Sequence, residues 1–429
     1  MIAHILARVE AGDTKPTLVV CPASLVYNWT AELERFAPSL DVCAIVGAKA
    51  QRRVQIAGAA EHNVVVTSYD LMRRDIDEYV EQDFARVVLD EAQYIKTPLT
   101  QVARAAKRLP AGVRFALTGT PIENRLSELW SIFDFLMPGL LGTRESFAKR
   151  FESPVEHAEG DSAARLQALG SPFVLRRVKE DVVADLPEKI EDTVMAQLTG
   201  EQRKLYLANQ DRIAQQVQHR EASEFKKDKL KVLAELTKLR QICCDPHLHY
   251  EDYKAGSAKL DACMELVHGA LDGGHHILLF SQFTGMLDII GKRLAKEDIG
   301  FLKLTGASSK ESRAKMVAQF QAGEVPVFLI SLKAGGVGLN LTAADVVIHY
   351  DPWWNVAAQD QATDRAHRIG QQHTVTVYKL IAKDTIEERI MQMQESKRDL
   401  VNSVLGGDGI SSALFTREDV LALLGGDGR

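Results

Sequence analysis

The sequence predicts an α/β protein with two lobes, each built on a parallel sheet, joined by a helical insertion. Three observations predict this fold. Short apolar runs alternate with helix-permitting segments near the start, the alternation stops between residue 123 and about 260, and it then returns. Apolar runs that end in polar or proline-containing turns are typical of buried strands in βαβ units. A chain of 429 residues has room for two or three domains.

The first lobe contains four predicted strands, and we place it at 1–135. The strands lie at 17–22 (TLVVCP), 63–70 (NVVVTSYD), 86–93 (RVVLDEAQ) and 114–121 (RFALTGTP). The segments between them are long enough for the crossover helices that parallel strands require. In such sheets ligands bind beyond the carboxyl ends of the strands, so the chemistry is expected there.

The middle of the chain, 136–255, is predicted to be a helical insertion and linker, with helices at 201–216 and 224–242. The second lobe, 256–405, returns to apolar runs. These lie at 275–283 (HHILLFSQF), 300–306 (GFLKLTG), 325–332 (VPVFLISL), 344–351 (ADVVIHYD) and 374–381 (TVTVYKLI). The sequence GGDG occurs twice after residue 405, which indicates a flexible tail over 406–429 around a short helix.

The composition excludes several classes of protein. With 46% hydrophobic and 26% charged residues, the chain is neither collagen-like nor wholly disordered. No apolar run approaches the roughly 18 residues of a membrane span. Five cysteines without CxxC spacing indicate neither a disulfide framework nor a zinc site, so we expect a reducing, cytoplasmic location. The net charge of −6 means that a polyanion would be bound by local patches and backbone amides.

Two carboxylates follow the predicted strand at 86–93 directly. In an NTPase the first of such a pair, here Asp90, holds Mg²⁺ through water, and the second, Glu91, orients or deprotonates the attacking water. A solvated turn is the alternative interpretation. The next strand ends in LTGTPIEN, where Thr118, Gly119 and Thr120 suit a small turn facing the same crevice. The alternative there is a tight turn before a helix that Pro121 begins.

The second lobe contains a pair of arginines and a glycine-rich turn. Arg365 and Arg368 are three residues apart, so on a helix they would share one face and present two guanidinium groups to a phosphate chain. A salt-bridged surface helix is the alternative. Just upstream, 331–345 (SLKAGGVGLNLTAAD) follows a strand, and its glycines, including Gly336 and Gly338, would let backbone N–H groups approach an anion.

These motifs together resemble the Swi2/Snf2 family of superfamily 2 helicase-like ATPases, in its bacterial type. The segments DEAQYIKT, LTGTPIENRLSELWSIFDFL, FVLRRVKEDV, LRQICCDPHL, GVGLNLTAADVVIHYDPWWN and DRAHRIGQ occur in the family's order, and the resemblance covers about residues 17–395. It implies two RecA-like lobes with ATP and Mg²⁺ between them, and double-stranded DNA tracked without strand separation. It also implies work on a nucleoprotein complex or RNA polymerase at the nucleoid.

The resemblance implies a role for individual residues. Asp90, as the Mg²⁺ ligand through water, and Glu91 correspond to motif II, and Arg365 and Arg368 to the motif VI arginines that reach the nucleotide. The residues implied on the nucleotide side are Gln93, Gly336, Gly338 and Gln361. Those implied in DNA contact or coupling are Pro22, Ser24 and Leu25 (motif Ia), Thr67, Ser68 and Tyr69 (Ib), Thr118, Gly119 and Thr120 (III), Ser281, Gln282 and Phe283 (IV), and Asn340 (V). Lys226, Lys227 and Lys229 could line a duplex track, or they could simply belong to an exposed charged helix. Trp353 and Trp354 are assigned to packing.

The start of the chain departs from the family. There a phosphate loop precedes the helix that resembles MIAHIL, with which this chain opens, and Gly291-Lys292 does not match the phosphate-loop pattern. We therefore expect an incomplete first lobe with exposed interior strand edges, from a truncation, a misassigned start or a split gene. On this view the chain alone has no appreciable ATPase activity. The predicted function is a DNA-dependent ATPase and duplex translocase, and the alternatives are a non-catalytic DNA- or partner-binding module and one half of a split enzyme.

Overall fold

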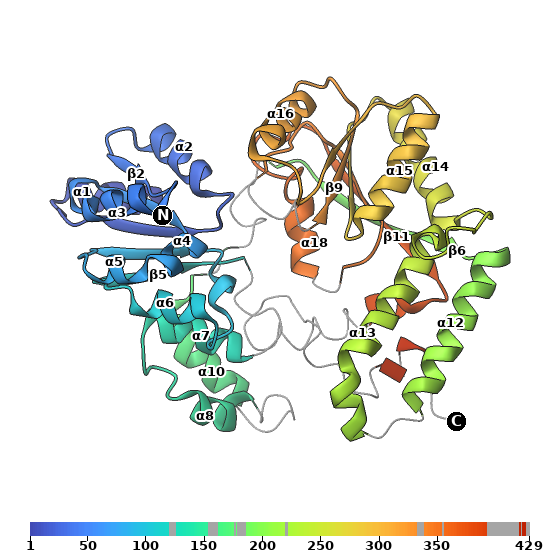
Figure 1. The fold of residues 1–429 in the computed structure, drawn as a ribbon. Helices are drawn as coiled ribbons and strands as arrows, with labels where there is room; N and C mark the ends of the chain where they lie inside the picture. Colours follow the sequence, from blue (N-terminus) through green and yellow to red (C-terminus); the bar gives the residue numbers. More distant parts are fainter. Residues whose placement is uncertain are drawn as a thin grey trace. The chain divides into compact units, whose positions relative to one another are not determined.

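The computed structural model describes residues 1–119, 126–152, 162–175, 177, 186–218, 222–332, 339–353, 356–392, 420–421 and 423–425. They form two compact units, with the described residues up to Leu175 in unit 1 and those from Arg177 onward in unit 2. Each unit contains its own parallel sheet (Figure 1). The prediction of an α/β protein with two parallel sheets is therefore confirmed.

Unit 1 is built on a five-stranded sheet. Its strands are β1 (Thr17–Cys21), β2 (Val42–Ala44), β3 (Val64–Ser68), β4 (Arg86–Asp90) and β5 (Val113–Leu117), in the order β2-β3-β1-β4-β5 and all parallel to their neighbours. The four strands predicted for this lobe are confirmed. The edge strand β2 was not predicted, although it lies in the apolar run 42–46 (VCAIV); its three residues are only partly buried.

Helices connect and cover the strands of unit 1. They are α1 (Ile2–Glu10), α2 (Val26–Phe36), α3 (Lys49–Ala57), α4 (Tyr69–Arg74), α5 (Ile76–Val80), α6 (Gln101–Arg108), α7 (Leu126–Leu136), α8 (Arg144–Phe147) and α10 (Ser162–Gly170). Residues of α7, α8 and α10 form a hydrophobic cluster around Trp130, Phe133 and Phe147. This cluster gives the end of unit 1 a small core of its own.

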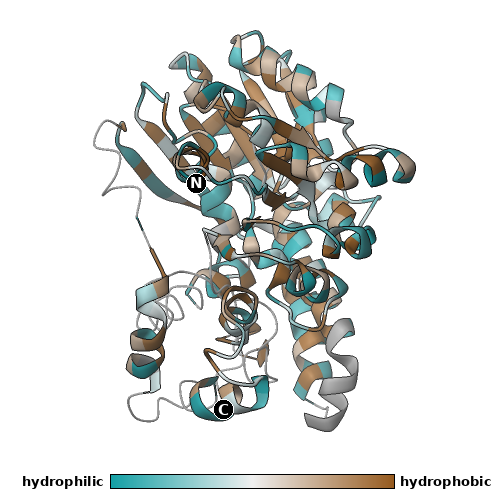
Figure 2. Cartoon of the chain, turned by 90° about the vertical axis from the view of Figure 1, so that its left-hand side faces the viewer, coloured by the Kyte–Doolittle hydropathy of each residue, from teal (hydrophilic) through white to brown (hydrophobic). Residues whose placement is uncertain are grey.

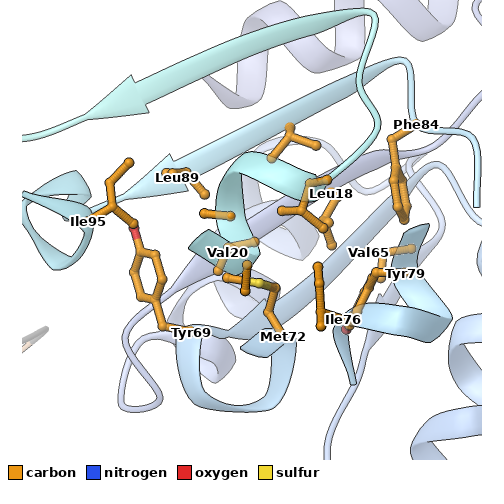
Figure 3. Close-up of a cluster of buried hydrophobic side chains, with 14 of the residues drawn as sticks. Leu18, Val20, Val65, Tyr69, Met72, Ile76, Tyr79, Phe84, Leu89 and Ile95 are labelled. Atoms are coloured by element: carbon orange, nitrogen blue, oxygen red, sulfur yellow. The ribbon is translucent and has the colours of Figure 1, made fainter. Parts of the chain in front are cut away.

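The main core of unit 1 lies against one face of the sheet. Because side chains alternate along a strand, Leu18, Val20 and Leu89 share one face. There they pack with Met72 and Tyr79 of the helices that follow β3 (Figure 3). All five residues of both β1 and β3 are buried. This burial fixes the strand ends, and therefore the polar residues that follow them.

Unit 2 is built on a six-stranded parallel sheet. Its strands are β6 (Lys189–Gln197), β7 (Ile277–Ser281), β8 (Phe301–Leu304), β9 (Val327–Ser331), β10 (Val346–His349) and β11 (Val375–Lys383), in the order β6-β11-β10-β7-β9-β8. The five strands predicted for the second lobe are confirmed. Figure 2 colours the chain by hydropathy, and the strands inside the fold are mostly brown there because their residues are hydrophobic.

Both faces of the second sheet are covered. Leu279 and Leu329 face a core that includes residues of α14 (Ala258–Asp272) and α15 (Thr284–Lys296). Phe280 and Phe328 face the opposite way, toward residues of α16 (Lys310–Gln321) and α18 (Val356–Thr363). A sheet buried on both faces explains why its strands could be recognised as continuous apolar runs.

Two long helices, α12 (Gly200–Gln218) and α13 (Ala222–Cys244), confirm the helical segments predicted at 201–216 and 224–242. The same stretch of chain also holds β6, where no strand was predicted. Its nine residues pair with β11 at the edge of the sheet, and most of its side chains are exposed. An exposed edge strand needs no apolar run, and none marks β6 in the sequence.

The end of the chain departs from the predicted flexible tail. Val420, Leu423 and Leu424 are buried in the core of the α12–α13 hairpin. The Gln210 side chain donates a hydrogen bond of 2.6 Å to the Leu424 carbonyl, and Arg389 donates one of 2.9 Å to the Leu423 carbonyl. The described residues of this segment are therefore packed. Within the part of the chain that the structure describes, no helix has the length and apolarity to cross a membrane.

Candidate nucleotide and DNA site

The acidic pair lies at the carboxyl end of β4, as predicted. Asp90 is the last residue of the strand, and Glu91 follows it with a φ of 52°, in the left-handed region that residues other than glycine rarely adopt. Such backbone strain costs about 1–3 kcal/mol and is concentrated at functional sites. Both side chains are partly exposed. They can therefore meet a ligand from solvent.

The Asp90 carboxylate is held by two neutral donors. The Trp29 indole Nε1 donates to Asp90 Oδ2 at 2.8 Å, and the Glu91 backbone N–H donates to Oδ1 at 3.0 Å. Burial raises the pKa of Asp90 above its ordinary value, and the two hydrogen bonds offset only part of this rise. Neither donor carries a charge, so the negative charge of Asp90 remains available for a cation.

Aromatic residues support the backbone beneath the acidic pair. The buried Tyr69, predicted in motif Ib, donates its hydroxyl to the Asp90 carbonyl at 2.8 Å. Its ring stacks on Tyr94, with centroids 4.8 Å apart and planes 4° apart. Tyr69 therefore anchors the strand end rather than presenting its hydroxyl to solvent.

Glu91 is joined to the end of the neighbouring strand through Gln93. Gln93 Nε2 donates to Glu91 Oε2 at 2.6 Å, and the Thr118 hydroxyl donates to Gln93 Oε1 at 2.9 Å. The structure thus brings together three residues that the sequence singled out: Glu91 of motif II, Gln93 on the nucleotide side and Thr118 of motif III. Gly119 follows Thr118 and is exposed, whereas Thr120 lies outside the described residues.

The oxygen ligands at this strand end fit Mg²⁺. Magnesium in nucleotide sites commonly takes one or two carboxylates and completes its shell with water and phosphate oxygens. Asp90 is such a carboxylate, partly exposed and bonded to neutral donors. Among the residues that the structure describes, no group of three or more His, Cys, Asp or Glu side chains is placed to hold a metal ion.

The predicted DNA contacts of unit 1 differ in accessibility. After β1, Pro22 is buried and Ser24 is exposed, and the Leu25 N–H donates to the Pro22 carbonyl at 2.8 Å. At the end of β3, Thr67 and Ser68 are buried. The Ser68 hydroxyl accepts the Leu71 N–H, which caps α4. Ser24 is therefore the accessible side chain among these predicted contacts.

The predicted motif IV residues lie at the end of β7 on a buried polar network. The Ser281 hydroxyl donates to the fully buried Asp351, and the Gln282 N–H lies 3.3 Å from both oxygens of that carboxylate. Arg240, from α13, donates to the Gln282 side chain at 3.2 Å and to the Pro352 carbonyl. Its guanidinium lies 5.8 Å from the centre of the Phe283 ring. The network connects the predicted DNA contact to the helical hairpin within unit 2.

The predicted arginine pair is not on a regular helix. Helix α18 ends at Thr363, and turns follow it. The Gln371 side chain donates to the Ala366 carbonyl at 3.2 Å, as well as to the carbonyls of Thr342 and Ala344, and Gly370 has a φ of 102°. These features replace continued helix with turns. The prediction that the arginines share one helical face is therefore wrong.

The two arginines instead meet the segment that holds Asn340. The Arg365 carbonyl accepts the Leu341 N–H at 3.0 Å, and Arg368 Nη1 donates to the Leu339 carbonyl at 3.2 Å. Arg365 is buried and Arg368 is exposed. Asn340 is also exposed, so parts of predicted motifs V and VI lie together.

Several predicted residues cannot be placed in this arrangement. Gln361 lies on α18 and is partly exposed. Nearby, the buried His349 of β10 lies with its Nε2 2.8 Å from the Thr363 hydroxyl, which fixes the end of this helix. Gly336, Gly338 and Trp354 lie outside the described residues, as do the side chains of Lys226, Lys227 and Lys229.

The sequence reasoning missed four residues that hold the site. Asp351 ends the predicted strand at 344–351, so the strand-end signal that selected Asp90 could have found it. Arg240 falls at helical spacing from the apolar Leu236, Leu239 and Cys243, so its place on the apolar face could have marked it as buried and paired. Gln371 had no distinguishing local pattern. Trp29 had none either, because its partner lies 61 residues away in the sequence.

Two family models match the chain. The SNF2-related domain matches residues 1–248, and the helicase conserved C-terminal domain matches residues 258–370. The first match alone covers more than half of the 429 residues. The two matches together span both units.

Curated relatives are bacterial and eukaryotic. The chain is 40% identical over 431 residues to the putative ATP-dependent helicase/translocase YwqA of Bacillus subtilis, covering 97% of this chain and 46% of the relative. It is 39% identical over 410 residues to an uncharacterized ATP-dependent helicase of Mycoplasma pneumoniae, covering 95% and 39%. With the TATA-binding protein-associated factor MOT1 of Saccharomyces cerevisiae it shares 32% identity over 470 residues, covering 96% and 25%. The chain thus spans less than half the length of these relatives.

Among solved structures, the chain is similar to the SWI2/SNF2 ATPase core of Sulfolobus solfataricus in complex with double-stranded DNA. The identity is 36% and the TM-score is 0.45, with 94% of this chain and 85% of that chain covered. The matched ranges contain the strand-end carboxylates of β4 and the arginines after α18. The chain therefore belongs to the Swi2/Snf2 family of helicase-like ATPases.

Proposed function

We propose that this chain is the motor part of an ATP-dependent translocase that moves on double-stranded DNA without separating the strands. The observation that carries the proposal is the geometry at the end of β4. There the Asp90 carboxylate is fixed by neutral donors, and Glu91 is linked through Gln93 to Thr118 on the next strand. This arrangement suits a nucleotide site that responds to a neighbouring element.

In the proposed mechanism Asp90 would hold Mg²⁺ through water, and Glu91 would orient or deprotonate the attacking water. ATP bound with Mg²⁺ supplies the phosphoryl group whose hydrolysis drives the motion. Gln93 restrains Glu91 by donating to its carboxylate. Thr118 in turn fixes the Gln93 amide, so a shift at the end of β5 changes the position of Glu91.

The residues of unit 2 supply positive charge and DNA contact in this proposal. Arg365 and Arg368 stabilise the charge that develops on the phosphates in the transition state. Gln361, and Gly336 and Gly338, complete the nucleotide contacts. Asn340 and Gln282, with Ser24 of unit 1, contact the DNA backbone, where contacts carry no sequence information. The buried Ser281 and Pro22 act through the backbone that they support. Thr67 and Ser68, buried in this structure, act through the backbone that they support.

The proposed partner is double-stranded DNA in the cytoplasm, at the nucleoid. Two relatives support it by their descriptions, one as a putative ATP-dependent helicase/translocase and one as an ATPase core in complex with double-stranded DNA. A nucleoprotein complex, such as an RNA polymerase on DNA, is the proposed object of remodelling. The chain's own net charge of −6 means that DNA must be bound by local groups rather than by a global field.

The test compares ATP hydrolysis with translocation in the longest native polypeptide that carries this chain. Duplex DNA should stimulate hydrolysis, and a third strand bound to the duplex should be displaced while the duplex itself stays paired. Glu91→Gln should abolish both while ATP still binds, because an amide cannot accept the water's proton. Glu81→Gln, at an exposed carboxylate of the same unit, is the matched control and should behave like the parent. ATP-independent binding of DNA without any hydrolysis would favour the non-catalytic module instead.

A further inference from the structure

The indole of Trp29 makes a hydrogen bond to the acidic pair across 61 residues of the sequence. Trp29 lies in the first turn of α2, and its Nε1 reaches Asp90 Oδ2 at 2.8 Å. The contact joins a helix after β1 to the end of β4. It is a side-chain contact between two partly buried groups, so water competes with it less than at an open surface.

An indole suits this position for a chemical reason. It offers one N–H donor, no acceptor and no charge. A lysine or arginine in its place would neutralise Asp90 and repel a cation, whereas a hydroxyl or amide could rotate and present an acceptor. The indole can therefore orient the carboxylate without weakening its charge.

The Asp90 carboxylate also keeps acceptor positions for a cation and its bound water. An ionised carboxylate has about four acceptor positions. One on Oδ2 is taken by Trp29 and one on Oδ1 by the Glu91 N–H, so each oxygen keeps a free position. Because both donors are fixed in place, the directions of these remaining positions are fixed too.

We propose that Trp29 is a positioning residue that orients Asp90 toward Mg²⁺ and its bound water. This inference rests on the proposed function, since it assigns the metal to Asp90. It also gives α2 a role at the nucleotide site. Groups that orient metal ligands commonly contribute about 10- to 100-fold to metal affinity.

Trp29 also links Asp90 to the segment after β1. The Trp29 backbone N–H donates to the Leu25 carbonyl at 2.8 Å, and the Leu25 backbone N–H donates to the Pro22 carbonyl at 2.8 Å. The exposed Ser24 lies in this same short segment. Movement of this segment on binding a DNA phosphate would therefore be passed to the carboxylate through one side chain.

The first measurement follows the indole N–H resonances of the chain in a two-dimensional nitrogen–proton NMR spectrum. The four tryptophans give four such signals, and Trp29→Phe identifies the one from Trp29. Asp90→Asn should shift the Trp29 signal, as should Mg²⁺ added with ADP. The indole of Trp130 donates to the Gly142 carbonyl at 3.0 Å, so its signal is the internal control and should stay in place.

The second measurement is the affinity for Mn²⁺ in the presence of ADP, read from the loss of the free-ion signal in electron paramagnetic resonance. Trp29→Phe should weaken it about tenfold or more. Trp130→Phe, the matched control, should leave it unchanged, and Asp90→Asn should remove the site.

The outcomes separate this inference from the proposed function. If the Trp29 indole signal did not shift in Asp90→Asn, the inference would be overturned, even if Trp29→Phe failed to fold. Loss of Mn²⁺ affinity in Asp90→Asn with parental affinity in Trp29→Phe would overturn the role of Trp29 and leave the function standing. Parental affinity in Asp90→Asn, or no response of the parent to either metal, would overturn the metal role of Asp90 and both proposals.

Discussion

The Thr118 hydroxyl donates a hydrogen bond of 2.9 Å to Gln93 Oε1, and this bond joins the ends of the neighbouring strands β4 and β5. Through the second bond of Gln93, it reaches Glu91. A polar chain of this kind holds the carboxylate in one orientation while both bonds are made.

We expect Thr118→Val to lower the DNA-stimulated rate of ATP hydrolysis about 2- to 10-fold, because one hydrogen bond contributes about 0.5–1.5 kcal/mol. Thr118→Ser keeps the hydroxyl and should retain the rate. The measurement is kcat in saturating ATP, with ATP affinity recorded alongside. Equal rates in the valine and serine variants would show that the bond has no part in turnover.

The arginines after α18 are expected to act on rate more than on DNA affinity. Arginine groups of this type contribute about 10³- to 10⁵-fold to phosphoryl transfer, so Arg368→Ala should reduce DNA-stimulated hydrolysis by orders of magnitude. Arg368→Lys should also hydrolyse ATP more slowly than the parent, because lysine lacks the two-pronged guanidinium of arginine. Arg365→Ala should in addition destabilise unit 2, since this side chain is buried.

The paired measurement is hydrolysis and duplex binding on the same variants at one salt concentration. Arg203→Ala removes an exposed arginine of α12 and serves as the control. If duplex binding collapsed in Arg368→Ala while turnover per bound complex stayed parental, the arginine would be a DNA phosphate contact.

His349 should make unit 2 sensitive to acid. Burial, with a smaller effect of Lys379, lowers its pKa from 6.5 to about 3, against an opposing effect of Glu191. Between these values the unfolded chain binds a proton that the folded chain does not. The contribution of His349 to the free energy of unfolding is therefore fully present above pH 6.5. It is lost as the pH falls toward 3, by about 1.4 kcal/mol per pH unit.

The comparison is between the parent and His349→Gln at pH 7.5 and 5.5. On going from pH 7.5 to 5.5, the free energy of unfolding should fall by about 1.4 kcal/mol more in the parent than in the variant. Urea-dependent labelling of Cys243 and Cys263, both buried in unit 2, reports the unfolding of this unit alone. Parallel pH dependence of the two proteins would contradict the assignment.

Lys259 and Glu387 form a fully buried ion pair, with Nζ 2.8 Å and 3.0 Å from the two carboxylate oxygens. Removing one partner leaves a buried charge alone, so Lys259→Met should destabilise unit 2 by about 3–5 kcal/mol. Adding Glu387→Leu should recover much of this loss. The recovery should be incomplete, because Glu387 also accepts the Ala382 N–H.

The same cysteine labelling measures this prediction. A double variant less stable than Lys259→Met would show that Glu387 stabilises the fold mainly through its other contacts. A single variant as stable as the parent would show that the pair contributes nothing.

The strands of the fold could be predicted because burial on both faces leaves apolar runs in the sequence. β6 could not, since an edge strand with exposed side chains carries no such run. The position of Asp90 followed from its place after a strand. The helical placement of Arg365 and Arg368 failed, because spacing alone does not reveal that Gln371 binds the backbone carbonyl of Ala366. Trp29 and Asp90 meet only through the tertiary fold, which no local pattern encodes.

The pairing of β6 with β11 has a practical meaning for anyone who wishes to produce unit 2 by itself. An expression boundary near residue 256 would strip away the edge strand and the α12–α13 hairpin. It would leave the outer backbone groups of β11 unpaired and remove the Tyr206 hydroxyl that binds the Ile386 N–H at 2.7 Å. A fragment intended to fold should therefore start before Lys189 and include Pro187, whose carbonyl lies 2.7 Å from His367 Nε2.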